Sequence, residues 1–354
     1  MTFAGRITPA QRAEMARRGQ QQFRAELVAK AEAEARRLQQ AYTQMLRRLD
    51  EQLGLMNLAD EGALYSARSI ERMRAQVAEA LSSLTSTIEA QARQMEAGGI
   101  SIGARAGEQA MTTSLGGVAF NRPSVESIRA LVGYVDSASF QAAMNSYGEY
   151  HADAVADILL DGASRGIDPI KTARAVTKYT QKMPYYDALR TVRTVQLWSA
   201  RAASHEIYRQ NADVVTGWMW SSALGPNTCM ACRRMHGNIF PLNKTLNDHH
   251  MGKCAPVPVT KSWGALGISG GSEVLEGVPT GIQLFQQMKT DAEQIAAMGS
   301  RAAWLAWKDG RFKLEDFAVP YQNAIYGEMT GEASLTDLVG PELAAAYEKM
   351  ARAA

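Results

Sequence analysis

The chain has 354 residues, of which 46% are hydrophobic, and a formal net charge of +2. This length allows two or three domains with buried cores, and the composition excludes a disordered polymer. Three cysteines are too few for the disulfide framework of a secreted domain, so we expect reduced thiols or metal ligands in a cytosolic compartment. The first residues lack the apolar segment of a signal peptide, and no run of eighteen apolar residues occurs, so neither export nor a membrane span is expected.

The charge is distributed unevenly along the chain. Residues 171–261 carry 13 Lys and Arg against 4 Asp and Glu, whereas residues 99–170 and 262–354 are acidic. A basic middle is compatible with a nearby polyanion, although solvated helix faces often give the same count. The charge therefore does not decide between these two interpretations.

The N-terminal part has the pattern of two long helices. Apolar residues spaced by three and four run from Val28 to Leu49 and again from Ile70 to Met95. This is a heptad pattern, and the break between the two runs predicts an antiparallel helical hairpin over residues 1–98 that ends at Gly98-Gly99. The hairpin could cover a core as a two-helix layer or reach toward a partner subunit.

A Gly-rich segment and a second set of helices follow. Residues 98–123 contain six glycines and no lasting periodicity, which predicts a linker over 99–123. Residues 124–212 read as a central helical domain, with helices near 124–135, 138–164, 169–181 and 185–211. The third helix has a clear start signal, with Asp168 as N-cap and Pro169 at the first helical position.

Beyond residue 212 the pattern changes to short strands. Residues 214–222 are rich in β-branched and aromatic residues, and 237–242 and 255–259 look extended. Residues 213–260 thus form a small α+β subdomain. Residues 261–354 are predicted as a helical tail, with helix near 281–308, loops through 309–332 and a last helix from Pro341. The predicted fold class is mainly α with this small α+β subdomain.

All three cysteines and three of the five histidines lie within residues 229–254. Cys229 and Cys232 share one tight turn, a knuckle whose two sulfurs can reach one ion. Soft ligands return at His249, His250 and Cys254. The three cysteines and one of the two adjacent histidines would fill a structural zinc site of the Cys3His type, with no open position for catalysis.

Other chemistries fit the same residues less well. A thioredoxin-like pair needs a helix that starts at the first cysteine and runs on, whereas here an extended segment soon follows. A nucleophilic Cys/His pair could use His205 or His236, but no third orienting group is visible. A zinc deaminase needs a different His-x-Glu spacing, and the chain has no HExxH, GxxxxGK[ST] or GxGxxG motif. Reduced thiols without metal remain the plain alternative.

Residues 187–259 resemble the phage head morphogenesis, or minor capsid, family of the phage Mu F type. The family pattern is an Arg-Thr helix, a Val-x-x-x-Trp strand, a CxxC knuckle, a Gly-x-x-Phe turn, and His-Pro-x-Cys-Arg-Cys before a Val-Pro strand. The matching residues here are Arg193-Thr194, Val214 and Trp218, Cys229 and Cys232, Gly237 and Phe240, and Val257-Pro258. The similarity covers at most about 40% of the chain and leaves the hairpin and the tail outside it.

The resemblance implies a ligand set and also exposes a departure. Counted back from Val257-Pro258, Cys254 matches the second family cysteine and His249 the histidine, whereas Gly252 stands in place of the first cysteine. Cys229, Cys232, His249 and Cys254 are therefore the expected ligands of a structural Zn²⁺. His250 and His236 are alternates.

By resemblance, the protein is expected to be a non-enzymatic minor capsid component in the phage head near the portal vertex, present in the host cytoplasm during assembly. The expected partners are the portal protein, the major capsid protein and packaged double-stranded DNA. We expect weak DNA contacts from the basic residues Arg190, Arg193, Arg201, Arg233 and Arg234. The alternative is a DNA-binding zinc module in regulation or recombination. A toxin-type enzyme in the tail, as some relatives carry, has no recognisable catalytic set here.

Overall fold

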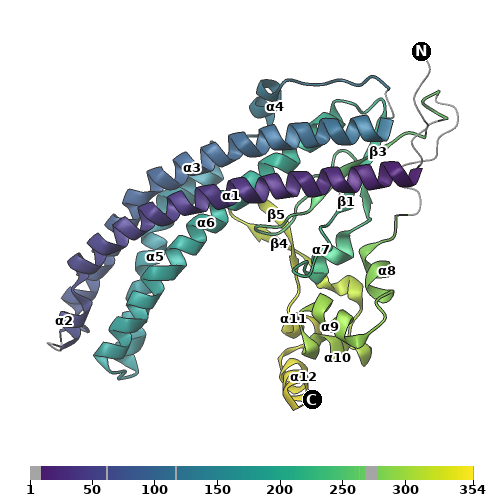
Figure 1. The fold of residues 1–354 in the computed structure, drawn as a ribbon. Helices are drawn as coiled ribbons and strands as arrows, with labels where there is room; N and C mark the ends of the chain where they lie inside the picture. The colour runs from purple at the N-terminus through teal and green to yellow at the C-terminus, as the bar shows by residue number, and fades with distance from the viewer. Residues whose placement is uncertain (1–8, 61–62, 116–117, 263, 268–277, 354) are drawn as a thin grey trace. The chain divides into compact units, whose positions relative to one another are not determined.

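The computed structural model describes residues 9–60, 63–115, 118–262, 264–267 and 278–353 (Figure 1). The chain is mainly α-helical with two small antiparallel sheets, which confirms the predicted fold class. The elements are α1 (Pro9–Leu53), α2 (Leu55–Asp60), α3 (Ala67–Leu115), α4 (Val125–Val132), α5 (Ala138–Ser164), α6 (Pro169–Arg209), β1 (Val215–Ser221), α7 (Met230–Met235), β2 (Ile239–Phe240), β3 (Ala255–Thr260), α8 (Gly281–Gln286), α9 (Asp291–Met298), α10 (Arg301–Lys308), the 3-10 helix η1 (Leu314–Phe317), β4 (Ala318–Asn323), β5 (Gly327–Glu332), α11 (Leu335–Val339) and α12 (Pro341–Ala353).

The chain divides into two compact units that differ from the five consecutive segments predicted above. One unit, the helical unit, comprises Leu27–Gly98 and Gly133–Gln196; the other, the sheet unit, comprises Met1–Glu26, Gly99–Val132 and Leu197–Ala354. The predicted border at 98 coincides with a border between the two units, whereas those at 123, 212 and 260 lie inside the sheet unit. The long helices α1, α3 and α6 each contribute residues to both units.

In the helical unit, α1 and α3 form the predicted antiparallel hairpin. Arg37 bonds to Gln94 and Gln76 to the Gln52 carbonyl, so the two helices run in opposite directions. The apolar residues of the predicted pattern form the buried face of each helix. Leu38 and Leu49 on α1 pack inward, and so do the apolar residues of the row from Met73 to Met95 on α3. Burial of this stripe, rather than helix propensity alone, stabilises such long helices.

The predicted end of the hairpin at Gly98-Gly99 is wrong, and so is the linker over most of 99–123, because α3 continues to Leu115. At least one of the glycines serves close helix packing instead. A Cβ at Gly103 would overlap the Ala200 carbonyl, whereas at Gly98 it would meet only the movable end of the Lys30 side chain. Ser204 donates its hydroxyl proton to the Gly103 carbonyl at 2.7 Å, so the backbones of α3 and α6 approach closely within the sheet unit.

The predicted break near residues 181–185 is also wrong, because α6 is one helix with Pro184 inside it. Proline has no N–H, so the Thr180 carbonyl loses its usual helical donor. The Tyr42 hydroxyl of α1 donates to that carbonyl and replaces the missing bond. The predicted start of α6 is confirmed, since the Asp168 carboxylate accepts the Lys171 N–H at 3.1 Å.

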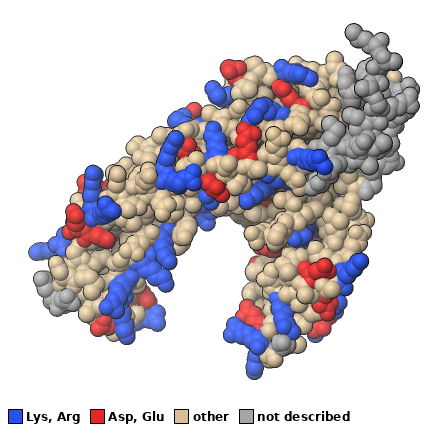
Figure 2. Space-filling view, in the orientation of Figure 1, with Lys and Arg blue, Asp and Glu red and all other residues tan. Residues whose placement is uncertain are grey.

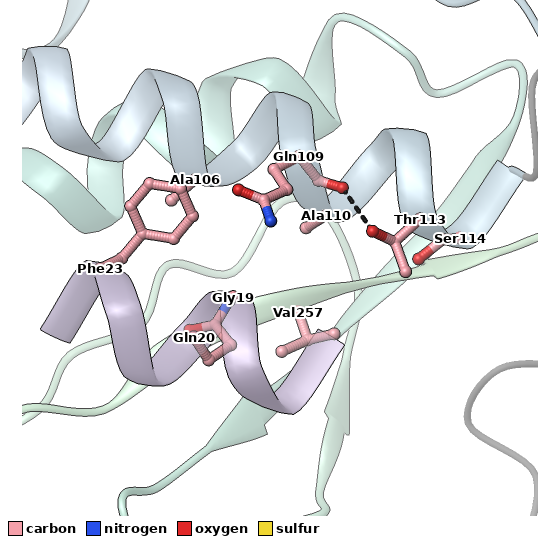
Figure 3. A pocket seen from close by; sticks show the side chains of 9 residues that line it. All are labelled: Gly19, Gln20, Phe23, Ala106, Gln109, Ala110, Thr113, Ser114 and Val257. Atoms are coloured by element: carbon pink, nitrogen blue, oxygen red, sulfur yellow. Dashed lines mark hydrogen bonds between the residues drawn. The ribbon is translucent and has the colours of Figure 1, made fainter. Parts of the chain in front are cut away.

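Gly19 lets α1 lie close to α3 in the sheet unit. Gly19 faces the end of α3, and a Cβ there would lie 3.1 Å from Gln109 Nε2. Figure 3 shows the cavity that remains between Phe23, Gln109 and Val257. Its volume is about 20 Å³, which is room for about one water molecule.

The three predicted strands are confirmed and form one antiparallel sheet in the order β2-β1-β3. Trp218 of β1 lies between Phe240 and Pro258 in register. The prolines of β3 are tolerated because β3 is an edge strand. Trp218 and Trp220 are fully buried in the core beneath the sheet, which also takes side chains from α3, α4 and α6.

The tail is not purely helical as predicted. Residues 318–323 and 327–332, predicted as loop, pair as the β4–β5 hairpin, and the helix predicted over 281–308 is three helices, α8 to α10. The tail core contains Phe285, Phe317 and Tyr347, and also Met230 of α7. It is therefore part of the sheet unit rather than a separate segment.

Candidate metal centre

The CxxC turn begins the short helix α7. Cys229 is the N-cap residue, and its Sγ accepts the Cys232 N–H at 3.3 Å. Glu332, at the end of β5, accepts the Met230 N–H at 2.6 Å, so the β4–β5 hairpin fixes the same turn from the other side. Backbone donors at the first turn of a helix favour negative charge, which suits a pair of thiolates.

His249 lies against both sulfurs of this turn. Its Nε2 is 3.3 Å from Cys229 Sγ and 3.2 Å from Cys232 Sγ. The three ligand atoms all lie within 4.8 Å of one another. His249 Nδ1 is 2.9 Å from the His250 carbonyl, an acceptor that keeps a proton on Nδ1, so Nε2 is the nitrogen that faces the thiols and can bind a metal.

Cys254 belongs to a second triad that shares Cys232. Cys232, Asp248 and Cys254 are all buried, and their ligand atoms lie within 4.8 Å of one another. The Cys254 Sγ is 3.3 Å from the Ser222 hydroxyl. All four predicted ligands thus lie in two overlapping triads, and Asp248 is a fifth group that the sequence analysis did not include.

Asp248 organises the loop that carries His249 and Cys254. Its carboxylate accepts the backbone N–H groups of both residues, at 2.9 and 3.2 Å, and the Cys232 thiol at 3.4 Å. Its position is set by the guanidinium of Arg201, 3.0 Å away. Asp248 and Arg201 are only 1% and 5% exposed, and a buried charge of this kind requires a partner.

Arg201 was predicted to contact DNA, and the structure contradicts this. Besides Asp248, it donates to the carbonyl of Cys254 at 2.8 Å and to that of Gly252. All three acceptors lie on the loop of residues 246–254, which carries the predicted ligands His249 and Cys254. This arginine of α6 therefore fixes the position of that loop. Arg24 of α1 assists by donating to the carbonyls of Lys253 and Ser221, at 3.1 and 3.0 Å.

Gly252 stands where the Mu F-type pattern has a cysteine, and its surroundings show what occupies this position instead. A Cβ at this position would overlap the carboxylate of Asp248. A side chain and the buried Asp248–Arg201 pair therefore cannot both fit at this site. The glycine accompanies a different way of fixing the loop, in which Cys254 is the only cysteine.

The alternate ligands His236 and His250 lie outside both triads. His236 Nδ1 accepts the Ser222 N–H at 3.0 Å, and burial lowers the pKa of its ring to about 4. His250 Nε2 pairs with the Asn323 side chain at 3.1 Å. Each histidine therefore holds a neighbouring segment in place. His205, considered as a partner for a nucleophilic cysteine, packs edge-on against Trp218 instead.

The protonation of the first triad prepares it for a cation. The hydrogen bond from Cys232 lowers the pKa of the Cys229 thiol to about 5. Burial opposes protonation of His249, but the bond to Cys229 and the charge of Asp248 raise its pKa to about 10. A bound metal ion would replace the shared proton and draw thiolate and neutral imidazole forms from the same groups.

A pocket of about 280 Å³ gives access to the cluster. Cys229, Cys232, His249 and Cys254 line it, together with residues of the 223–228 loop and Lys253. An entry path is one requirement of a metal site. The ligand softness fits zinc well, since thiolate and imidazole are the usual ligands of structural zinc.

The remaining residues predicted to contact DNA do not form a free basic surface. Arg233 is buried like Arg201 and donates to the carbonyls of Gly225 and Thr228, at 3.0 and 3.2 Å. Arg190 is paired with Asp187. Arg193 and Arg234 are half-buried.

No protein-family model, curated protein or solved structure matches this chain. Among the helices of the described residues, none is both long and apolar enough to cross a membrane.

Proposed function

We propose that this chain is a minor capsid protein of the phage Mu F type and that a structural zinc ion holds its knuckle together. The observation that carries the proposal is the meeting of Cys229 and Cys232 with His249, which is 17 residues from the nearer cysteine. They meet beside a sheet whose strands β1, β2 and β3 fall where the family pattern has its Val-x-x-x-Trp, Gly-x-x-Phe and Val-Pro segments.

We assign the fourth zinc ligand to Cys254. The oxygens of Asp248 already accept bonds from Arg201 and from two backbone N–H groups, whereas the Cys254 sulfur lies beside the Ser222 hydroxyl, at 3.3 Å, and close to the Cys232 sulfur. Zinc also prefers thiolate at structural sites. Asp248 then acts as an outer-shell acceptor that orients the loop.

Zinc bound by four protein ligands supplies a cross-link rather than an open position for a substrate. It would tie α7 to the 246–254 loop, whose buried apolar side chains are Leu246 and the proposed ligand Cys254, with Met251 exposed. We therefore propose an architectural rather than enzymatic role, in the phage head near the portal vertex. The proposed protein partners are the portal and major capsid proteins, met in the host cytoplasm during assembly.

The alternative of a regulatory or recombination module with sequence-selective DNA binding has less support. Such a module reads base edges with exposed side chains near its metal site. Arg201 and Arg233, two basic residues of the predicted set beside the knuckle, are buried and bound to carbonyls.

The zinc part is tested by metal analysis of the purified full-length chain. We expect about one zinc per chain, and loss of that zinc from a C229S/C232S variant. An H250A variant is the matched control, because it removes a neighbouring imidazole outside both triads and should keep its zinc. A wild-type chain with far less than one equivalent after growth in zinc-supplemented medium would refute the metal assignment.

The capsid part needs a separate experiment. We expect the genes beside this one to encode a portal protein and a major capsid protein. Co-expression with that portal protein should give a complex that survives affinity purification and size-exclusion chromatography. Unrelated neighbouring genes and no complex would refute the capsid role while leaving the zinc site intact.

A further inference from the structure

The outer face of α6 in the helical unit carries a continuous row of cations. Lys171, Arg174, Lys178 and Lys182 are all exposed and follow one another at spacings of three, four and four residues. At 100° per residue these positions fall within an arc of about 80° on the helix. Figure 2 shows Lys and Arg gathered over this part of the α5–α6 hairpin. We call these four residues the α6 basic row.

Among the described residues the row has no acidic partner, unlike Arg74 and Arg93 of the same unit. No Asp or Glu occurs from Pro169 to Tyr186. None of the four side chains forms an ion pair with a residue that the structure describes, whereas Arg74 binds both Glu149 and Asp153, and Arg93 binds Asp136.

Like charges three and four residues apart destabilise a helix. The α6 basic row contains three such neighbouring pairs: Lys171 with Arg174, Arg174 with Lys178, and Lys178 with Lys182. Uncharged or acidic residues at these exposed positions would stabilise the helix more than the four cations do. An external polyanion is the kind of partner that relieves this repulsion and makes use of it.

We infer that the α6 basic row binds the phosphate backbone of double-stranded DNA without reading its sequence. From Lys171 to Lys182 the row is about 17 Å long at 1.5 Å per residue. One DNA strand places about five phosphates over that length, so four cations match the charge that one strand presents. Tyr186, exposed at the next position of the row, adds a hydroxyl that can donate to a phosphate.

The inference draws on the proposed function only in that a minor head protein works beside packaged DNA. It also replaces the five arginines expected from the sequence with a different surface. The zinc site takes no part in it, because the four residues of the row belong to the helical unit and the ligands to the sheet unit. Metal analysis and DNA binding can therefore fail independently.

A second copy of this chain is the competing partner. Helix α5 carries acidic residues at four-residue spacing, namely Glu149, Asp153, Asp157 and Asp161. Three of these already face arginines of the chain: Glu149 and Asp153 share Arg74, and Asp161 binds Arg165. Two arginines thus offset half of the four negative charges, and duplex DNA, with a continuous row of phosphates, fits the basic row better.

The test is fluorescence anisotropy with a labelled 20-base-pair duplex of mixed sequence, titrated with the full-length chain from 50 to 200 mM salt. Four phosphate contacts predict a slope of log affinity against log salt of about −3.6, which is roughly a 150-fold loss over this range. The K171Q/R174Q/K178Q/K182Q variant should bind at least about tenfold more weakly at 50 mM salt and lose most of the slope.

The control variant K244Q/K261Q/K289Q/K349Q removes the same four charges from exposed lysines elsewhere. It should bind DNA within about twofold of wild type, and circular dichroism should show that both variants retain their helices. Equal weakening of both variants would mean that net charge alone attracts the DNA and would overturn the inference. It would also be overturned if the row variant bound DNA normally, or if its only effect were to dissociate an oligomer seen by sedimentation.

Discussion

Replacing Tyr42 by phenylalanine tests how α6 remains a single helix across Pro184. The Tyr42 hydroxyl donates to the Thr180 carbonyl, which has no helical donor because residue 184 is proline. Tyr42 and Thr180 are 3% and 2% exposed, so water cannot take over this bond. Burial raises the pKa of Tyr42, and the phenol therefore stays a donor. We expect Y42F to cost about 1–3 kcal/mol, the penalty of a buried carbonyl left without a donor.

A double-mutant cycle with P184A isolates this effect. Alanine restores an N–H at position 184 that can bond to the Thr180 carbonyl, so the Tyr42 hydroxyl becomes less important. Urea unfolding of the four proteins, followed by far-ultraviolet circular dichroism, should give a coupling of about 1–2 kcal/mol between the two substitutions. If Y42F cost the same in both backgrounds, within about 0.3 kcal/mol, the hydroxyl would not be compensating for the proline.

Three further predictions concern the zinc site, Gly252 and the buried histidine His151. Removal of zinc by a chelator should lower the thermal midpoint of the wild-type chain but not that of C229S/C232S, since zinc at 100 times its dissociation constant stabilises by about 2.7 kcal/mol. G252A, or the family residue in G252C, should cost about 1–3 kcal/mol by displacing Asp248, whereas G225A, where a Cβ meets nothing within 4 Å, should be close to neutral in thermal unfolding. Burial lowers the pKa of His151 to about 4, below its unfolded value of about 6.5, so its share of stability is complete above pH 6.5 and is lost as pH falls toward 4. Urea unfolding at pH 7.5 and 4.5 should show a smaller loss for H151Q than for wild type, by up to about 3 kcal/mol, and an equal loss would contradict this assignment.

The fold was predictable wherever a residue type has one structural use, and not where it has two. The apolar row from Met73 to Met95 can only be a buried helix face, and it is one. Glycine can end a helix or let another backbone approach, and Gly103 does the second. Proline can break a helix or be compensated, and the Pro184 helix is continuous because Tyr42, 142 residues earlier, supplies the missing donor. A local pattern does not reveal such a partner.

The metal site was also predictable only in part. The spacing of Cys229 and Cys232 and the return of His249 and Cys254 identified the ligand residues, because few other uses explain soft ligands at these positions. Asp248 was missed although it is adjacent to His249, since an isolated carboxylate in a sequence gives no sign that it will be buried. Its burial depends on Arg201, 47 residues earlier on α6, which the charge pattern alone assigned to DNA.

The Asp248–Arg201 pair also changes the meaning of Gly252. Considered with the family pattern, the glycine is a lost ligand; considered with the pair, it is the space that the Asp248 carboxylate occupies. D248N tests this by leaving the Arg201 charge buried without its partner, which should cost about 3–5 kcal/mol in urea unfolding and weaken zinc binding by about 10- to 100-fold. The double variant D248N/R201M removes the unpaired charge and should recover part of the stability but not the zinc affinity, because the loop carbonyls of Gly252 and Cys254 would still lack their donor. Full recovery of zinc affinity would mean that the pair stabilises the loop without orienting its ligands.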